Sequence, residues 1–65
     1  MEILTWQARI RADLTLRQLE ALTGISKTTL NNIENGKTSP TLWQLERIAV
    51  ATGSRITDLF DSAIK

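Results

Sequence analysis

The 65-residue chain carries eight Lys and Arg side chains against seven Asp and Glu, a formal net charge of +1, and 42% of its residues are hydrophobic. It contains no Cys and no His, which removes disulfides, thiolate metal sites and imidazole bases, so we expect no metal, no cofactor and no enzymatic activity. A chain of this length forms a single domain over residues 1–65. No apolar run approaches the roughly 20 residues needed to cross a bilayer, and the N-terminus has no signal pattern, so a cytoplasmic protein without a membrane partner is expected.

The N-terminal segment carries apolar residues at helical spacing. Ile3, Trp6, Ile10 and Leu14 recur every three or four positions, which predicts a first helix before Thr15. Trp6 lies on this apolar stripe, so we expect its indole in the core.

Two capping patterns predict two short helices that follow each other closely. Thr15, with Gln18 three residues later, is typical of a helix start, and Gly24 ends that helix. Ser26 caps the start of a second helix only two residues later. Because so short a connection places the second helix at a steep angle to the first, we predict a helix-turn-helix over residues 16–35, approximately.

The rest of the chain predicts two more helices. Thr41 with Gln44 opens a longer helix that Gly53 ends, and its apolar face consists of Leu42, Leu45, Ile48, Ala49 and Thr52. Trp43 lies on the opposite side with Arg47 and Val50; it is either exposed, which indicates a partner, or covered by the first or last helix. The segment 56–64 predicts a short closing helix. The expected fold is all-α, a compact five-helix bundle.

The second helix of the predicted pair has a polar face opposite Leu30 and Ile33. At 100° per residue, this face comprises Lys27, Thr28, Asn31, Asn32 and Asn35. Amide, ammonium and hydroxyl groups of this kind recognise base edges in the major groove of DNA. The alternative is an ordinary solvated surface.

Two neighbouring features are suited to hold phosphate groups. The helix that begins after Thr15 has free backbone amides and a positive dipole end, with Arg17 in its first turn. The loop after the polar helix groups amides, hydroxyls and a cation within residues 35–38. For this loop the alternative is an ordinary turn.

The run from Leu14 to Phe60 resembles the Cro and phage-repressor helix-turn-helix family, also called the Xre family. The matching motifs are LT before the first helix of the pair, the GIS turn, the IENG ending, the SPTL that opens the next helix, and IA, G and DLF towards the end. The resemblance implies a lambda repressor-like five-helix domain that binds operator sequences in double-stranded DNA, usually as a two-fold dimer. It implies a transcriptional regulator, typically a repressor, that reads the major groove with its third helix.

Carried over onto this sequence, the resemblance implies base contacts from Lys27, Thr28 and Asn32, with Asn31 on the same face. The implied phosphate contacts are Arg17, Ser26, Asn35, Lys37 and Thr38. Two positions depart from the family. Leu16 stands where a phosphate-gripping Gln is usual, and Glu20 stands where a small Ala packs between the two helices. Either the packing at Glu20 is more open, or its side chain turns outward to a cation such as Lys27.

The family also pairs an arginine of the first helix with the glutamate of IENG, which is Glu34 here. Ungapped counting selects Arg9, whereas the apolar stripe of the first helix selects Arg11. We expect Arg9 to form this structural ion pair, with Arg11 as the alternative.

A domain of this size reaches only one half-site, so a homodimer is expected, at least on DNA. No small-molecule effector is expected, because the chain has no room for a second domain to bind one. The alternative function is a helical protein–protein interaction module, such as an antitoxin-like or adaptor partner, that uses Trp43 and the closing helix.

Overall fold

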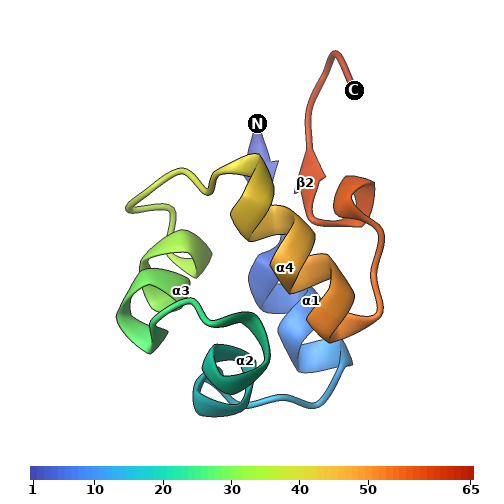
Figure 1. Ribbon diagram of the computed structural model, residues 1–65. Helices are drawn as coiled ribbons and strands as arrows, with labels where there is room; N and C mark the ends of the chain where they lie inside the picture. The colour runs from blue at the N-terminus through green and yellow to red at the C-terminus, as the bar shows by residue number, and fades with distance from the viewer.

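The computed structural model describes residues 1–65 and contains four α-helices and one small sheet (Figure 1). In chain order the elements are β1 (Glu2–Ile3), α1 (Thr5–Arg11), α2 (Leu16–Thr23), α3 (Lys27–Glu34), α4 (Leu42–Thr52), the 3-10 helix η1 (Ile56–Asp58) and β2 (Phe60–Asp61). The fold is therefore mostly helical, as predicted, but it is not a five-helix bundle. None of the helices has the length and apolar character required to span a bilayer.

Two helices begin with a reciprocal capping box. Thr15 Oγ1 accepts from the Gln18 amide at 3.1 Å, and Gln18 Oε1 accepts from the Thr15 amide at 2.8 Å. The same arrangement joins Thr41 and Gln44 at the start of α4, at 3.1 and 2.9 Å. Each box satisfies amides that have no partner inside the helix, which fixes where α2 and α4 begin.

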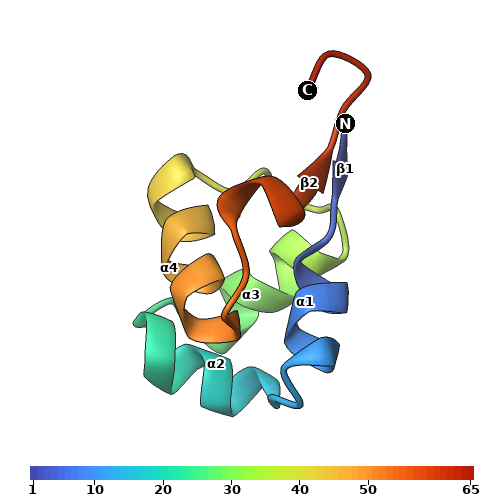
Figure 2. The same ribbon diagram turned by 90° about the vertical axis from the view of Figure 1, so that its right-hand side faces the viewer.

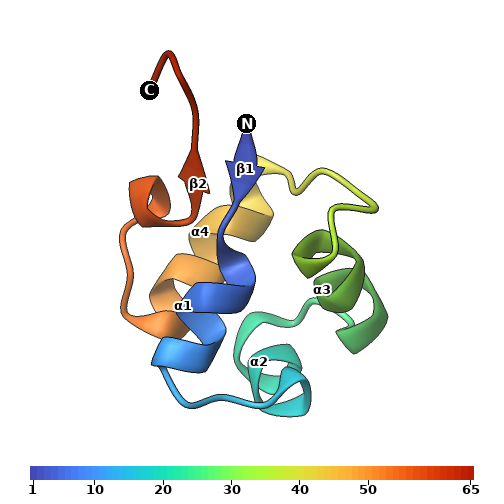
Figure 3. The ribbon, with the colours of Figure 1, turned by 180° about the vertical axis from the view of Figure 1, so that it is seen from behind.

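The core lies around α4, which contacts α1 and α2. In Figure 1 α4 lies in front of α1, and in the reverse view of Figure 3 the order is inverted, so the two helices pack face to face. The buried apolar side chains come from every α-helix, the α2–α3 turn and the C-terminal segment: Ala8, Leu19, Ile25, Leu30, Ile33, Leu45, Ile48, Ala49 and Leu59. Leu42 was expected on this inner face, but it is exposed because it is the first residue of α4 and lies beyond the core.

The prediction of which side of the first helix faces the core was wrong. Helix α1 starts only at Thr5, because Ile3 belongs to a strand, and it buries Thr5 and Ala8. Trp6 is 49% exposed and is not a core residue. The physical reason is the rotation of the helix: the small Ala8 and the guanidinium of Arg9 turn inward, which places Trp6 and Ile10 on the flank.

The predicted closing helix over 56–64 was also wrong. Only one 3-10 turn forms, and the chain then becomes extended and pairs antiparallel with the N-terminal strand. The partners in register are Glu2 with Asp61 and Ile3 with Phe60, and the Leu4 amide donates to the carbonyl of the buried Leu59 at 2.8 Å. Figure 2 shows the two strands side by side, with both chain ends beyond the helices. The backbone of this segment thus finds its partners at the other end of the chain instead of within a helix.

Candidate nucleic-acid interface

Helix α3 occupies one side of the molecule, with its outer face directed away from the core. In Figures 1 and 3, α3 lies on the opposite side of the molecule from η1; α2 lies below α3, and the loop that follows α3 lies above. Leu30 and Ile33 anchor its inner face and are almost completely buried. The Gly24 backbone has a φ of 75°, a left-handed conformation that lets the chain leave α2 and enter α3 within three residues.

The outer face of α3 is polar along its full length. The side chains of Lys27, Thr28, Asn31 and Asn35 are exposed, whereas Asn32 is half-buried. The Asn32 carbonyl accepts from the Lys37 amide at 2.9 Å, which folds the following loop back onto the end of the helix. The structure therefore groups the five polar residues on one surface, with Asn32 at its inner edge.

The start of α3 is closed by side chains. Ser26 Oγ accepts from the Thr29 amide at 3.1 Å and donates to Thr29 Oγ1 at 2.9 Å. The carboxylate of Glu20 reaches across from α2, and its Oε2 accepts from the Lys27 amide at 2.9 Å. Glu20 thus turns towards Lys27, but its partner is the backbone amide and not the ammonium group.

The start of α2 is open by comparison. Beyond the Thr15 and Gln18 capping box, the amides of Leu16 and Arg17 have no partner in the protein, and the first turn contains no acidic residue. The guanidinium of Arg17 is exposed and makes no ion pair. Unpaired amides at a helix start, close to a cation, provide favourable contacts for an anion.

The loop after α3 presents a second polar group. Gly36 adopts a left-handed φ of 72°, which reverses the chain after Asn35. Lys37 and Thr38 are exposed, and their side chains make no hydrogen bond within the protein. This loop and the start of α2 flank the polar face of α3 on two sides (Figure 1).

A largely buried ion pair holds the far end of α3. Arg9 Nε donates to Glu34 Oε2 at 2.7 Å, and Arg9 Nη2 donates to Glu34 Oε1 at 3.0 Å, a bidentate contact. The remaining nitrogen, Nη1, donates to the Leu14 carbonyl at 3.0 Å. The side chains are only 12% and 3% exposed, respectively. Of the two candidate arginines, Arg9 makes the contact, and Arg11 is exposed on the other side of α1.

The same contact keeps the arginine charged. The hydrogen bonds to Glu34 raise the pKa of Arg9 above the ordinary value for arginine; burial opposes this shift, and the negative charge of Glu34 adds to it. Stability from a base with a raised folded pKa is complete below its unfolded pKa and is lost only as the pH rises through the folded one. For an arginine that range lies at extreme alkaline pH, so the pair stays intact at neutral pH.

The charged residues on this side of the molecule differ in whether they have a partner within the protein. Residues 15–38 contain three cations, Arg17, Lys27 and Lys37, and two acids, Glu20 and Glu34. Both acids accept hydrogen bonds from protein groups, whereas none of the three cations has an ionic partner. Arg9 neutralises Glu34, so three cations without an ionic partner lie around α3 together with one acid, Glu20, that is not paired with a cation.

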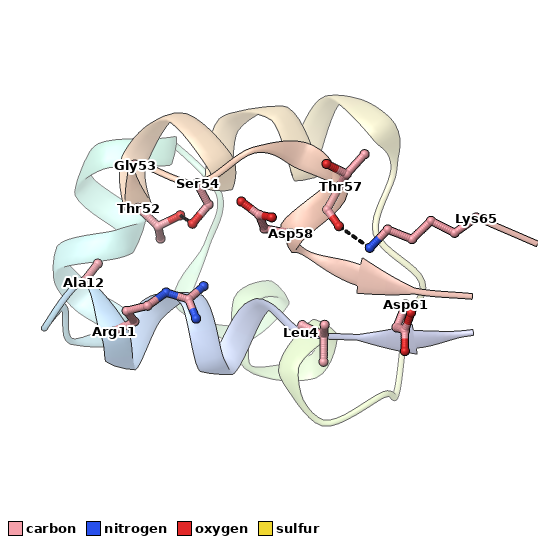
Figure 4. A pocket seen from close by; sticks show the side chains of 10 residues that line it. All are labelled: Leu4, Arg11, Ala12, Thr52, Gly53, Ser54, Thr57, Asp58, Asp61 and Lys65. Atoms are coloured by element: carbon pink, nitrogen blue, oxygen red, sulfur yellow. Dashed lines mark hydrogen bonds between the residues drawn. The ribbon is translucent and has the colours of Figure 1, made fainter. Parts of the chain in front are cut away.

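A surface depression of about 640 Å³ is lined by residues of α1, the end of α4 and the C-terminal segment, and by none of α3. Figure 4 shows Arg11 and Asp58 pointing into it from opposite walls. Lys65 also lines it, but its ammonium group donates to the carbonyls of Thr57 and Phe60. No group of three or more His, Cys, Asp or Glu side chains comes together anywhere in the chain.

The sequence did not reveal two contacts that shape this surface. Besides the Glu20 contact, Arg47 of α4 donates to the carbonyls of Thr23 and Leu22 at 3.4 Å each, at the end of α2. Arginine near a helix C-terminus was the available signal, but nothing in the sequence shows that α4 passes that end. Trp43, on the same side of α4, is 58% exposed, so neither end of the chain covers it.

Comparison with known families agrees with this arrangement. A family model described as helix-turn-helix matches residues 7–59, which is most of the chain and includes α2, α3 and α4. Comparison with individual characterised proteins gives no match. The chain therefore belongs to the Cro and phage-repressor (Xre-like) helix-turn-helix family of DNA-binding domains, and it is a DNA-binding transcription regulator.

Proposed function

We propose that the protein is a sequence-specific repressor that inserts α3 into the major groove of an operator. The observation that carries this proposal is the excess of free positive charge around α3: three cations have no ionic partner, whereas Glu34 is paired with Arg9 and Glu20 is the one acid without a cation. DNA carries a dense row of phosphate charges, so a surface on which free cations outnumber free acids is favourable for its approach.

The polar face of α3 supplies the groups for base recognition. An asparagine amide forms a bidentate pair with adenine, so we assign this role to Asn32, with Asn31 beside it. Lys27 donates to the acceptors of guanine, and the methyl group of Thr28 suits the methyl group of thymine. Lys27, Thr28 and Asn31 are exposed, which leaves them free to reach base edges.

The flanking features are the proposed phosphate contacts. On one side, the free amides of α2 and the Arg17 guanidinium bind one backbone strand. On the other, Asn35, Lys37 and Thr38 bind the second strand from the loop after α3. The Ser26 hydroxyl, which donates to Thr29 Oγ1 in the free protein, would turn to a phosphate oxygen on DNA.

We further propose that two copies bind together on DNA. One domain of 65 residues covers a single half-site, and two half-sites about 34 Å apart on one face of the duplex match a two-fold dimer. A bound dimer that covers an operator blocks access to it, which is the simplest form of repression.

A selection from random duplex DNA, followed by affinity measurements at several salt concentrations, tests the proposal. Binding should weaken by about one log unit per log unit of salt for each phosphate neutralised. Asn32→Ala should relax preference at one base position, weakening specific binding by about 1 to 3 kcal/mol, whereas Lys37→Ala should weaken all sequences alike. Binding that neither substitution changes contradicts the site assignment.

A protein–protein interaction module is the second candidate, and a specific observation favours it. Trp43, Leu22 and Val50 are all more than half exposed, and each lies on the outer side of α2 or α4. Exposed indoles often mark contact surfaces between proteins. Binding through this apolar surface would show little salt dependence, so the salt titration separates the two functions.

A further inference from the structure

The contact between Glu20 and the start of α3 has a consequence for DNA selectivity. Glu20 lies in the middle of α2, yet its Oε2 accepts from the amide of Lys27, the first residue of α3, at 2.9 Å. A carboxylate at this place brings a full negative charge to the positive end of the helix proposed to enter the groove. An acid at the centre of a DNA-facing surface lowers the attraction for phosphates, so its presence there requires an explanation.

The contact closes the start of α3 almost completely. Of its first four amides, Lys27 donates to Glu20, Thr29 donates to Ser26 Oγ, and Leu30 donates to the Ser26 carbonyl at 2.9 Å. Only the Thr28 amide lacks a partner. The start of α2, in contrast, keeps two free amides and has no acid in its first turn. The two helix starts on this side of the molecule therefore differ: one is open to an anion, and the other already holds one.

We propose that Glu20 is a specificity-determining residue: its carboxylate occupies the first backbone amide of α3 and thereby keeps DNA phosphates away from the amides of this helix start. This inference rests on the proposed function. When the protein sits on an unrelated sequence, α3 is not seated on base edges and its start faces the phosphate backbone. The charge of Glu20 then repels the DNA. When α3 is seated in its operator, the same end faces base edges and only the phosphate bound by the Ser26 hydroxyl, so the repulsion is smaller.

The hydrogen bond has a second effect, because it joins α2 to α3. It fixes the first residue of α3, and thus the direction in which Lys27 and Thr28 project, relative to the phosphate-binding start of α2. Base readout depends on this relation, since the phosphate contacts set the position from which the side chains reach the bases. Charge and geometry can be separated by substitution: Glu20→Gln keeps an acceptor oxygen for the Lys27 amide but removes the charge, whereas Glu20→Ala removes both.

The test measures affinities of the wild type, Glu20→Gln and Glu20→Ala for a selected operator and for unrelated duplex DNA. Glu46→Gln is the matched control, because Glu46 is an exposed residue of α4 with no hydrogen bond and the substitution changes the net charge equally. A charge at a helix start is worth about 0.3 to 1 kcal/mol, so Glu20→Gln should strengthen binding to unrelated DNA about two- to fivefold. Binding to the operator should change less. The specificity ratio, which is the affinity for the operator divided by the affinity for unrelated DNA, should therefore fall.

Glu20→Ala should lower the specificity ratio further, because operator binding itself weakens once the first turn of α3 loses its link to α2. Amide hydrogen exchange at Lys27 should accelerate in this variant and stay slow in Glu20→Gln. The inference is overturned if Glu20→Gln and Glu46→Gln change the ratio equally, or if operator and unrelated DNA gain affinity to the same extent. Wild-type protein that binds no duplex at all would overturn the proposed function and this inference together.

Discussion

The helix-turn-helix and the two ends of the chain are held in different ways. Within residues 15–35, the contacts that start each helix link residues only three to seven positions apart. The ends, residues 1–4 and 54–65, contribute two strands of two residues each, paired across almost the whole length of the chain. A two-stranded ribbon is marginal by itself. The difference teaches that the starts of α2 and α3 are fixed by nearby residues, whereas the structure of each chain end requires the other end.

The most damaging change should remove the contact that ties α1 to the helix-turn-helix. Glu34→Ala leaves the guanidinium of Arg9 largely buried without a partner, so the free energy of unfolding should fall by about 3 to 5 kcal/mol. Urea denaturation followed by circular dichroism measures this. Glu46→Ala, which truncates an exposed glutamate, is the control and should have little effect. A urea denaturation curve unchanged by Glu34→Ala would show that the pair contributes nothing to stability.

The next largest effect tests whether the C-terminal segment is a true part of the core. Leu59 is 0% exposed and packs in the main apolar cluster, so Leu59→Ala should lower the free energy of unfolding by about 3 kcal/mol. Ile64, only five residues further, is 95% exposed, and Ile64→Ala should leave stability unchanged. Equal effects from the two substitutions, measured by thermal denaturation, would contradict the placement of Leu59 in the core.

A smaller loss is expected from each helix cap in the other half. Thr15→Ala removes the acceptor for the Gln18 amide, and Ser26→Ala removes the acceptor for the Thr29 amide. Each should lower stability by about 1 kcal/mol. Hydrogen exchange should accelerate at the uncapped amide and its neighbours, while the amides of the strands stay unchanged. The exposed Thr57 of η1 caps no helix, so Thr57→Ala serves as the control. Faster exchange in the strands would show that the two halves are less independent than their contacts indicate.

The same division explains what could be predicted from the sequence. The bounds of α2, α3 and α4 follow from Ser and Thr caps and from two glycines, which are local signals, and the helical rotation alone places Lys27, Thr28 and Asn31 on the outer face of α3. The apolar spacing of the first helix was misleading, because the inward turn of Arg9 is set by Glu34, a residue of another helix.

The C-terminal segment shows that apolar spacing typical of a helix does not ensure that a helix forms. Ile56, Leu59, Phe60 and Ala63 have the spacing of a helix, yet the backbone after Leu59 is extended. Its pairing partner, β1, lies at the start of the chain, and strands of two residues leave no alternating pattern to read. The Glu20 contact is intermediate: its direction towards Lys27 was among the alternatives, but a carboxylate bound to a backbone amide leaves no trace in side-chain identities.

The smallest expected effect concerns the ribbon that joins the ends. Glu2 and Asp61 are direct partners in the register of β1 and β2, so two carboxylates project from the same face of the ribbon. Like charges at directly opposed positions destabilise a strand pair. Asp61→Asn, whose side-chain oxygen can still accept from the Ser62 amide, should therefore raise the free energy of unfolding by roughly 0.3 kcal/mol, and Asp61→Lys by somewhat more.

Both gains should disappear at about 1 M salt, where exposed charges are screened beyond roughly 3 Å. Thermal denaturation at low and high salt measures the difference, with Glu46→Gln as the control for net charge. If the gain persists at high salt, repulsion between the carboxylates is not its cause; if Asp61→Lys destabilises the protein at low salt, the two strands do not pair in this register.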